Sequence, residues 1–171
     1  MPMQTALELV RAIIILDSDG NRIYSKYYNG QEHQEKFESV LSKKTRKTGS
    51  DILLVDQNVV VFKSNLDCLF FVVGTLKDNE LMLLGVLDTL FESLEVVLNV
   101  SIERQSLLEN FDLLALIVDE IVDCGIVLEN DVKEIAAKVK RGSEFNISFS
   151  EKSLSSVYKS AKQQLAKSLL K

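Results

Sequence analysis

The stretch IILDSDGNRIY, residues 14–24, decides how the chain begins to fold. Apolar residues stand on both sides of a polar centre that contains Asp19-Gly20. An Asp-Gly pair between two apolar runs is typical of a two-residue hairpin, in which both central residues have positive φ. The sequence therefore predicts two antiparallel strands joined at Asp19 and Gly20.

The same stretch places oxygen-bearing side chains at alternate positions from Asp17 onward, as a calcium-binding EF-hand loop does. Such a loop needs glycine at its sixth position and glutamate at its twelfth. Counted from Asp17, those positions hold Arg22 and Tyr28. The sequence therefore favours a turn over a metal site.

Five runs of the sequence are typical of strands. The run before the turn, LVRAIIIL (9–16), is apolar on both of its alternating faces, which predicts a strand covered on both sides. The other runs lie at residues 22–28, 51–55, 59–63 and 68–75. Because short turn-forming segments separate the last three, we expect these to be antiparallel neighbours.

Helical periodicity accounts for most of the remaining sequence. Residues 31–47 predict a helix whose inner face holds Phe37, Val40, Leu41 and the aliphatic stem of Lys44. Residues 80–100 predict a longer helix that packs a broad apolar arc on the sheet. The members of that arc are Leu83, Leu84, Val86, Leu87, Leu90, Phe91, Leu94, Val97 and Leu98. Two further helices are predicted at residues 103–109 and 111–123.

This order of elements predicts an α/β protein of the α+β type, with a five-stranded antiparallel sheet that carries one helix on one face and two on the other. We assign residues 1–131 to this domain and residues 132–171 to a C-terminal helical extension. The extension begins with a modest helix and ends with a helix over residues 151–170, where Ser148 and Glu151 form a candidate capping box.

The last predicted helix has an apolar stripe made of Leu154, Val157, Tyr158, Ala161, Leu165 and Leu169. An isolated helix of ~20 residues is only marginally stable in water. We therefore expect it to dock, either on its own domain or on a partner.

Charge is distributed unevenly along the chain, although the net charge is only −5. Residues 80–131 carry one basic and twelve acidic side chains, a net charge of −11. Residues 132–171 carry nine basic and three acidic side chains, a net charge of +6. This separation suggests electrostatic contact with a partner, or of the tail with an anionic surface, and it also fits solvated helix faces of opposite sign.

Other compositional features predict a soluble cytoplasmic protein. No apolar stretch approaches the ~18 residues that a membrane span requires, and the N-terminus lacks the pattern of a secretory signal. Cys68 and Cys124 stand in apolar segments without a CxxC pattern, so we expect buried free thiols in a reducing compartment.

No catalytic, cofactor or metal site is evident in the sequence. The only histidine, His33, lies in a polar helix start and is expected to be exposed. Asp119, Glu120 and Asp123 crowd one short helix without a histidine, which favours a solvated acidic face. The basic run KKTRK (43–47) lies at a helix C-terminus, where cations complement the helix dipole, so we do not expect nucleic-acid binding.

One stripe of the 80–100 helix, away from its main arc, combines apolar and small side chains. Exposed apolar stripes mark interfaces, and small residues let another helix approach closely. The stripe predicts a partner-binding surface, unless later helices of the same chain cover it. Its members are Met82, Gly85, Thr89, Ser93, Val96 and Val100.

Three long strings of residues resemble a known family. They are VRAIIILDSDGNRIYSKYY, NELMLLGVLDTLFESL and LLENFDLLALIVDEIVDCGIVLEND. They are similar to the coatomer zeta subunits and, more distantly, to the sigma small chains of clathrin adaptors. The resemblance extends from about Leu7 to Asp131, and residues 119–129 are its most specific block.

The resemblance implies a longin-like fold and a non-enzymatic subunit of the coatomer (COP-I) coat. It implies a partner, the solenoid trunk of the coatomer gamma subunit, within the rest of coatomer. It further implies recruitment to Golgi membranes by an Arf-family GTPase, and a role in retrograde Golgi-to-ER and intra-Golgi transport.

Two other classes of protein share features with this sequence. A longin domain of another trafficking class could regulate a small GTPase, and a SNARE of that fold would need a heptad-repeat segment and a membrane anchor. A ligand-binding or hydrolytic domain on a profilin-like sheet would need convergent polar residues in a pocket. We see neither the SNARE segments nor such a pocket in the sequence.

Overall fold

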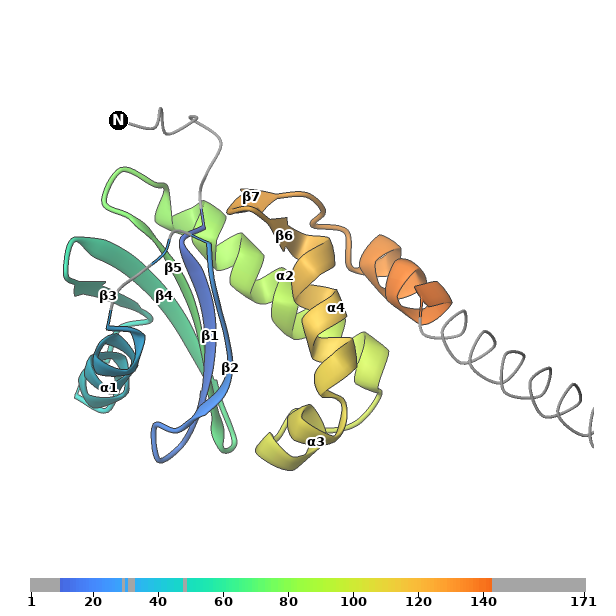
Figure 1. Cartoon of the computed structure of the whole chain (residues 1–171), viewed down its shortest axis with the longest axis horizontal. Helices are drawn as coiled ribbons and strands as arrows, with labels where there is room; N and C mark the ends of the chain where they lie inside the picture. Colours follow the sequence, from blue (N-terminus) through green and yellow to red (C-terminus); the bar gives the residue numbers. More distant parts are fainter. Residues whose placement is uncertain (1–9, 29, 31–32, 48, 143–171) are drawn as a thin grey trace, which may run out of the picture.

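The computed structural model describes residues 10–28, 30, 33–47 and 49–142. Among them, five strands form an antiparallel sheet in the order β2-β1-β5-β4-β3, with helices on both faces (Figure 1). The strands are β1 (Ala12–Asp17), β2 (Arg22–Tyr27), β3 (Ile52–Val55), β4 (Asn58–Asn65) and β5 (Cys68–Thr75). The predicted α+β fold and its five-stranded sheet are confirmed.

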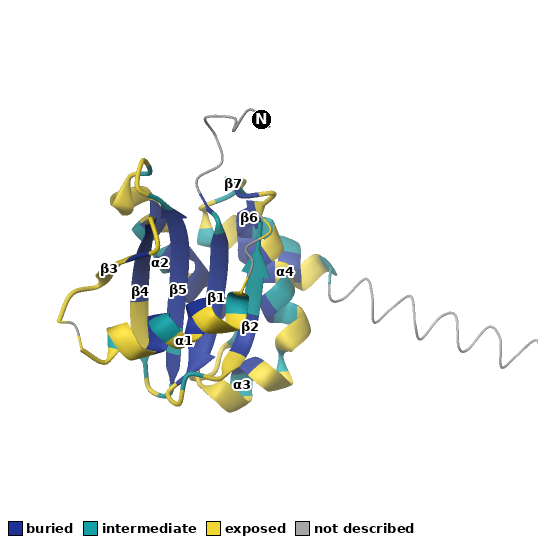
Figure 2. Cartoon of the chain, turned by 60° about the vertical axis from the view of Figure 1, so that its left-hand side comes forward, coloured by how far each residue is buried: buried dark blue, intermediate teal, exposed yellow. Residues whose placement is uncertain are grey.

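Strand β1 is buried on both of its faces, as predicted from its sequence. Ala12, Ile14 and Leu16 belong to a core beneath helix α1 (Gln34–Thr45), whereas Ile13 and Ile15 belong to a core on the opposite face. Figure 2 shows the central strands buried and the outer sides of the helices exposed.

The second core lies beneath α2 (Glu80–Leu98) and α4 (Phe111–Ile121), with α3 (Arg104–Glu109) between them in the chain. Helix α2 packs on β4 and β5, and α4 packs on α2. The arc predicted for α2 faces inward, with Leu83, Leu87, Leu90 and Leu94 fully buried. One helix thus covers one face of the sheet and two cover the other, as predicted.

The first hairpin is confirmed, but its predicted two-residue turn is wrong. Of Asp19 and Gly20, only Gly20 has positive φ. Asp17 donates its backbone N–H to Asn21 O at 2.8 Å, so three residues form the loop. The Asp17 carboxylate also accepts the Asn21 backbone N–H at 2.8 Å, which holds the longer turn closed. The Asp17 side chain, at the start of the turn, therefore stabilises the three-residue loop.

The two-residue turns with two positive φ values occur elsewhere. Asp56 and Gln57 form one between β3 and β4, and Cys124 and Gly125 form another. The latter joins two short strands after α4, β6 (Val122–Asp123) and β7 (Ile126–Val127), where the sequence predicts the end of a helix.

The cysteines differ in exposure. Cys68 is buried, as predicted, but the prediction of a buried Cys124 is wrong because that residue lies at the exposed β6–β7 turn.

Residues 132–142 are helical and pack on the main domain. Ile135 and Val139 are buried in the core beneath α2 and α4, and Lys138 forms ion pairs with Glu120 and Glu129. The domain boundary after residue 131 stays a prediction. The proposed capping box of Ser148 and Glu151 and the helix over 151–170 lie outside the described residues.

The outermost strand, β3, pairs with β4 on one side only. Leu53 and Val55 are buried beneath α1, whereas Ile52 and Leu54 point to the other face and are exposed. Lys44 of α1 donates its Nζ to the Leu54 backbone oxygen at 2.9 Å. The basic end of α1 therefore contacts the sheet edge, which fits the prediction that residues 43–47 belong to a helix end.

Candidate functional site

The predicted partner-binding stripe on α2 is divided by the fold. Its two ends are exposed, with exposed fractions of 51% for Met82, 47% for Val96 and 54% for Val100, and Gly85 is also exposed. Its centre is covered, because Thr89 and Ser93 are buried. Later parts of the chain therefore cover the middle of the stripe, the alternative that the sequence left open.

Later elements lie beside α2: helix α4 packs on it, and Val127 and Asn130 line a hollow together with Thr89. Small side chains such as Thr89 and Ser93 leave room for a second helix to approach. The Ser93 hydroxyl is fully buried and has no hydrogen-bond partner among the described residues. These two positions therefore serve the chain's own core in this structure, and an external contact would be made at the ends of α2.

Two hollows flank the N-terminal half of α2. One, of about 290 Å³, is lined by Met82, Gly85, Val86, Thr89, Val127 and Asn130. The other, of about 380 Å³, is lined by Gly49, Ser50, Asp51, Ile52, Val61, Glu80, Leu81 and Leu84. The first contains three residues of the predicted stripe, and the second contains none.

Further exposed apolar residues near this end of α2 were missed by the sequence analysis. Leu81 is 74% exposed and Ile52 is 44% exposed, and both line the larger hollow. Leu54 in β3 and Leu128 after β7 are also exposed. The alternation of Ile52 and Leu54 with buried neighbours was a usable signal, since it places them on the face opposite α1.

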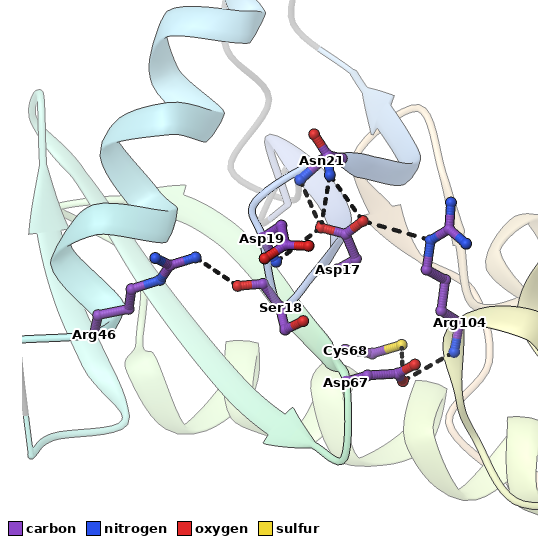
Figure 3. Close-up of polar contacts among 8 residues, drawn as sticks. All are labelled: Asp17, Ser18, Asp19, Asn21, Arg46, Asp67, Cys68 and Arg104. Atoms are coloured by element: carbon purple, nitrogen blue, oxygen red, sulfur yellow. Dashed lines mark hydrogen bonds and ion pairs between the residues drawn. The ribbon is translucent and has the colours of Figure 1, made fainter.

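A polar network joins the first hairpin, the β4–β5 turn and the start of α3 (Figure 3). Asp17 of the first hairpin accepts hydrogen bonds from Asn21 and Asp19 and lies 3.4 Å from the Arg104 guanidinium. The backbone N–H of Arg104 in turn donates to Asp67, in the β4–β5 turn, at 3.0 Å. The network fixes the start of α3 against both turns.

Ionisation in this network follows from its contacts. Burial raises the pKa of Asp17, but hydrogen bonds from Asn21 and Asp19 and the positive charge of Arg104 outweigh it, so the pKa lies below its usual value. Burial and a hydrogen bond to Asp67 raise the pKa of the Cys68 thiol to about 12. A thiol with that pKa is a poor nucleophile at neutral pH, so Cys68 is a structural residue.

The acidic residues of α4 form separate ion pairs. Asp119 accepts from Lys26 of β2 at 2.6 Å, and Glu120 lies 3.4 Å from Lys138. Asp123 and His33 are exposed, as predicted.

Within the described ranges, no group of three or more His, Cys, Asp or Glu side chains is arranged to hold a metal ion. In the same ranges, no helix is both long and apolar enough to span a bilayer.

Exposed apolar side chains thus lie at both ends of α2. Comparisons with known proteins identify the family to which the chain is similar. The family model described as clathrin adaptor complex small chain matches residues 9–145. Human coatomer subunit zeta-1 is 41% identical over 173 residues, which cover 99% of this chain and 97% of the relative. Coatomer subunit zeta-2 of Arabidopsis thaliana is 39% identical over 171 residues, which cover 95% and 96%.

A chain of the structure described as a homology model of the full-length AP-3 complex in a stretched open conformation has the same fold. It superposes with a TM-score of 0.63 at 19% identity and covers 84% of this chain and 99% of its own length. The sequence match extends over nearly the whole of the zeta relatives. This chain therefore belongs to the clathrin adaptor complex small chain family and, within it, to the coatomer zeta subunits.

Proposed function

We propose that this chain is a non-enzymatic subunit of the coatomer (COP-I) coat that pairs with the solenoid trunk of the gamma subunit. The observation that carries the proposal is the match to human coatomer subunit zeta-1, which spans 99% of this chain and 97% of the relative. Family membership makes the chain a vesicle-coat subunit. Pairing with gamma is the finer step that we propose.

Physical features of the chain support a role in assembly. Apolar side chains such as Leu81, Met82 and Val96 are exposed on α2. Interfaces between permanent partners often bury more than ~2,000 Å² and resemble a domain core. A partner that covers these side chains would stabilise both proteins, and we expect the isolated chain to associate nonspecifically at high concentration.

The cellular role follows from the same proposal. As part of coatomer, the chain would act in the cytoplasm and peripherally on Golgi and vesicle membranes. It would reach them through an Arf-family GTPase that recruits the whole coat, and would serve retrograde Golgi-to-ER and intra-Golgi transport. In this proposal the chain is held by other coat subunits and contacts the membrane only indirectly.

Co-expression with a gamma trunk fragment tests the proposal. Size-exclusion chromatography with light scattering should give a one-to-one complex. Met82→Asp and Val96→Asp, at opposite ends of the predicted stripe, then report which end makes the contact. Leu108→Asp is the matched control, because Leu108 is 44% exposed on the separate helix α3.

A monodisperse monomer that does not bind the trunk would overturn the proposal. Binding to an Arf-type GTPase that depends on the bound nucleotide, and that needs no trunk, would instead favour a longin module that regulates a small GTPase.

A further inference from the structure

The N-terminal half of α2 forms a ridge between the two hollows. Leu81 and Leu84 line the larger hollow on one flank, and Met82 and Thr89 line the smaller one on the other. Leu83 and Leu87 are fully buried against the sheet, so the side of the helix opposite them is the outermost part of this surface. We use "ridge" for Leu81, Met82 and Gly85.

The composition along the outer side of α2 changes with position. Its first two turns present Leu81, Met82 and Gly85, whereas later turns present Glu92 and Glu95. All five are exposed. Val96 is the exposed apolar residue of the later turns. Because the carboxylates of Glu92 and Glu95 lie beside it and their burial would be costly, an apolar contact along the outer side of α2 is favoured at the first two turns.

The floor and rim of the larger hollow complete the surface. Ile52 of β3 lines the hollow beside its cross-strand neighbour Val61. Ile52 is exposed, whereas Val61 is fully buried in the core beneath α2. Asp51 and Glu80 line the same hollow and are exposed. An apolar floor with two carboxylates at its rim favours a partner segment that has apolar side chains flanked by Lys or Arg.

We propose that two antiparallel helices of a helical solenoid dock on this ridge, and that each inserts apolar side chains into one of the two hollows. Packed helices lie about 8–10 Å apart, so two helices can seat on either side of a third. The occupant that we infer is a helical pair with apolar and basic side chains. This inference rests on the proposed function and specifies which surface of the chain meets the trunk.

Gly85 gives independent support for close approach at the ridge. A Cβ added to Gly85 would meet no atom of the described residues within 4 Å, so the packing of that part of the chain does not require glycine there. Glycine in a helix interior is unfavourable relative to alanine. A partner backbone that packs directly on α2 would benefit from the absence of a side chain at this position.

Binding measurements on full-length variants test the surface separately from the function. Leu81→Asp and Met82→Asp should weaken the affinity for the gamma trunk fragment by about a hundredfold, as loss of central apolar contacts does. Val96→Asp and Leu108→Asp, which lie elsewhere, should change it by less than about threefold. Failure of the unaltered chain to bind would overturn the proposed function, whereas binding that only Val96→Asp disrupts would overturn the ridge alone.

Gly85→Ala separates stability from binding. It should raise the Tm of the isolated chain by about 2 °C, because alanine favours the helix. It should also weaken trunk binding, and Gly85→Leu should weaken it further. Unchanged trunk affinity in both variants would contradict docking astride α2.

Alkylation of an introduced thiol identifies the occupant. In a Cys124→Ser background, which removes the exposed native thiol, Leu81→Cys should react rapidly with a maleimide in the free chain and at least about tenfold more slowly in the trunk complex. Leu108→Cys in the same background should react equally in both. Slow reaction of Leu81→Cys already in the free chain would mean that residues 143–171 of the same chain occupy the ridge. Unchanged reaction in the complex would place the trunk elsewhere, and either result overturns the proposal.

Discussion

The face of the sheet beneath α1 and the face beneath α2 and α4 differ in how much of their apolar surface the chain itself covers. Beneath α1, Phe37 and Leu41 close over strand residues such as Phe71. A buried carboxylate, Glu38, fastens the helix by pairing with Arg22 and accepting a hydrogen bond from the Tyr27 hydroxyl. We call this the closed face.

On the other face, which we call the open face, the core is larger but its margins are uncovered. The core includes Leu87, Leu90 and Ile117, all fully buried. At its margin, Leu81 and Ile52 remain exposed beside a hollow. The comparison teaches that one sheet can be stabilised from within the chain on one side and still present apolar surface for assembly on the other.

The largest expected effect separates the buried core from the exposed margin. Phe71→Ala should lower the free energy of unfolding by about 3–5 kcal/mol, because Phe71 is fully buried on the closed face. Leu81→Ala, at the open margin, should change it by less than about 0.5 kcal/mol. Urea denaturation of the isolated chain measures both. Equal losses would mean that the margin of the open face is part of the core.

A smaller effect is expected from the ion pair that anchors α1. Glu38→Ala should lower the free energy of unfolding by about 2 kcal/mol, because it removes charge-assisted hydrogen bonds from Arg22 and Tyr27. Lys63→Ala is the comparison on the open face, where Lys63 and Asp88 form an exposed pair, and should cost less than about 1 kcal/mol. If urea denaturation gave similar losses of unfolding free energy for Glu38→Ala and Lys63→Ala, the ion pair on the closed face would be no stronger than the one on the open face.

The turn that approaches α1 should be sensitive to a single added methyl group. Gly20 has a φ of 92°, and a Cβ there would lie 2.6 Å from the Ser42 hydroxyl oxygen of α1. Gly20→Ala should therefore cost about 1.5 kcal/mol in thermal unfolding. Gly49→Ala is the control, because no atom of the residues that the structure describes lies within 4 Å of a Cβ there. A neutral Gly20→Ala would show that this turn moves away from α1 readily.

The smallest effect concerns the polar network that links the hairpin to α3. The lowered pKa of Asp17 means that its ionised form stabilises the fold above the unfolded-state pKa of about 4, and that this contribution is lost as the pH falls further. Asp17→Asn should therefore be destabilising at pH 7 and have a smaller effect at pH 2–3. Urea midpoints across this range measure the difference, and a constant difference would exclude ionisation as its source.

Strong periodicity explains what the sequence predicted well. In β1 every residue is buried, and in α2 the inward arc recurs at helical spacing, so both elements could be recognised without knowledge of their neighbours. The pairing of β3 with β4 and of β4 with β5 was predicted because short turns leave adjacent strands few ways to pair. The pairing of β1 with β5, which sets the order of the sheet, was not predicted.

The misjudged positions depend on partners that are distant in the sequence. Thr89 and Ser93 are small residues on one side of α2, and their burial depends on how the later parts of the chain pack against that helix. Cys124 is the exception, because the turn that exposes it is local and is closed by Asp123 and Ile126. Glu38 was not recognised as buried because its partners, Arg22 and Tyr27, belong to another element.

The hydrogen bond from Lys44 to the Leu54 backbone oxygen affects self-association of a newly synthesised subunit before it is assembled into the coat. The outer edge of β3, flanked by exposed Ile52 and Leu54, is a template on which a second copy could add a strand. Such pairing would have to displace a charged side chain from an acceptor on that strand. Lys44 thereby disfavours sheet-to-sheet polymerisation while leaving the apolar face beside it accessible to the proper partner.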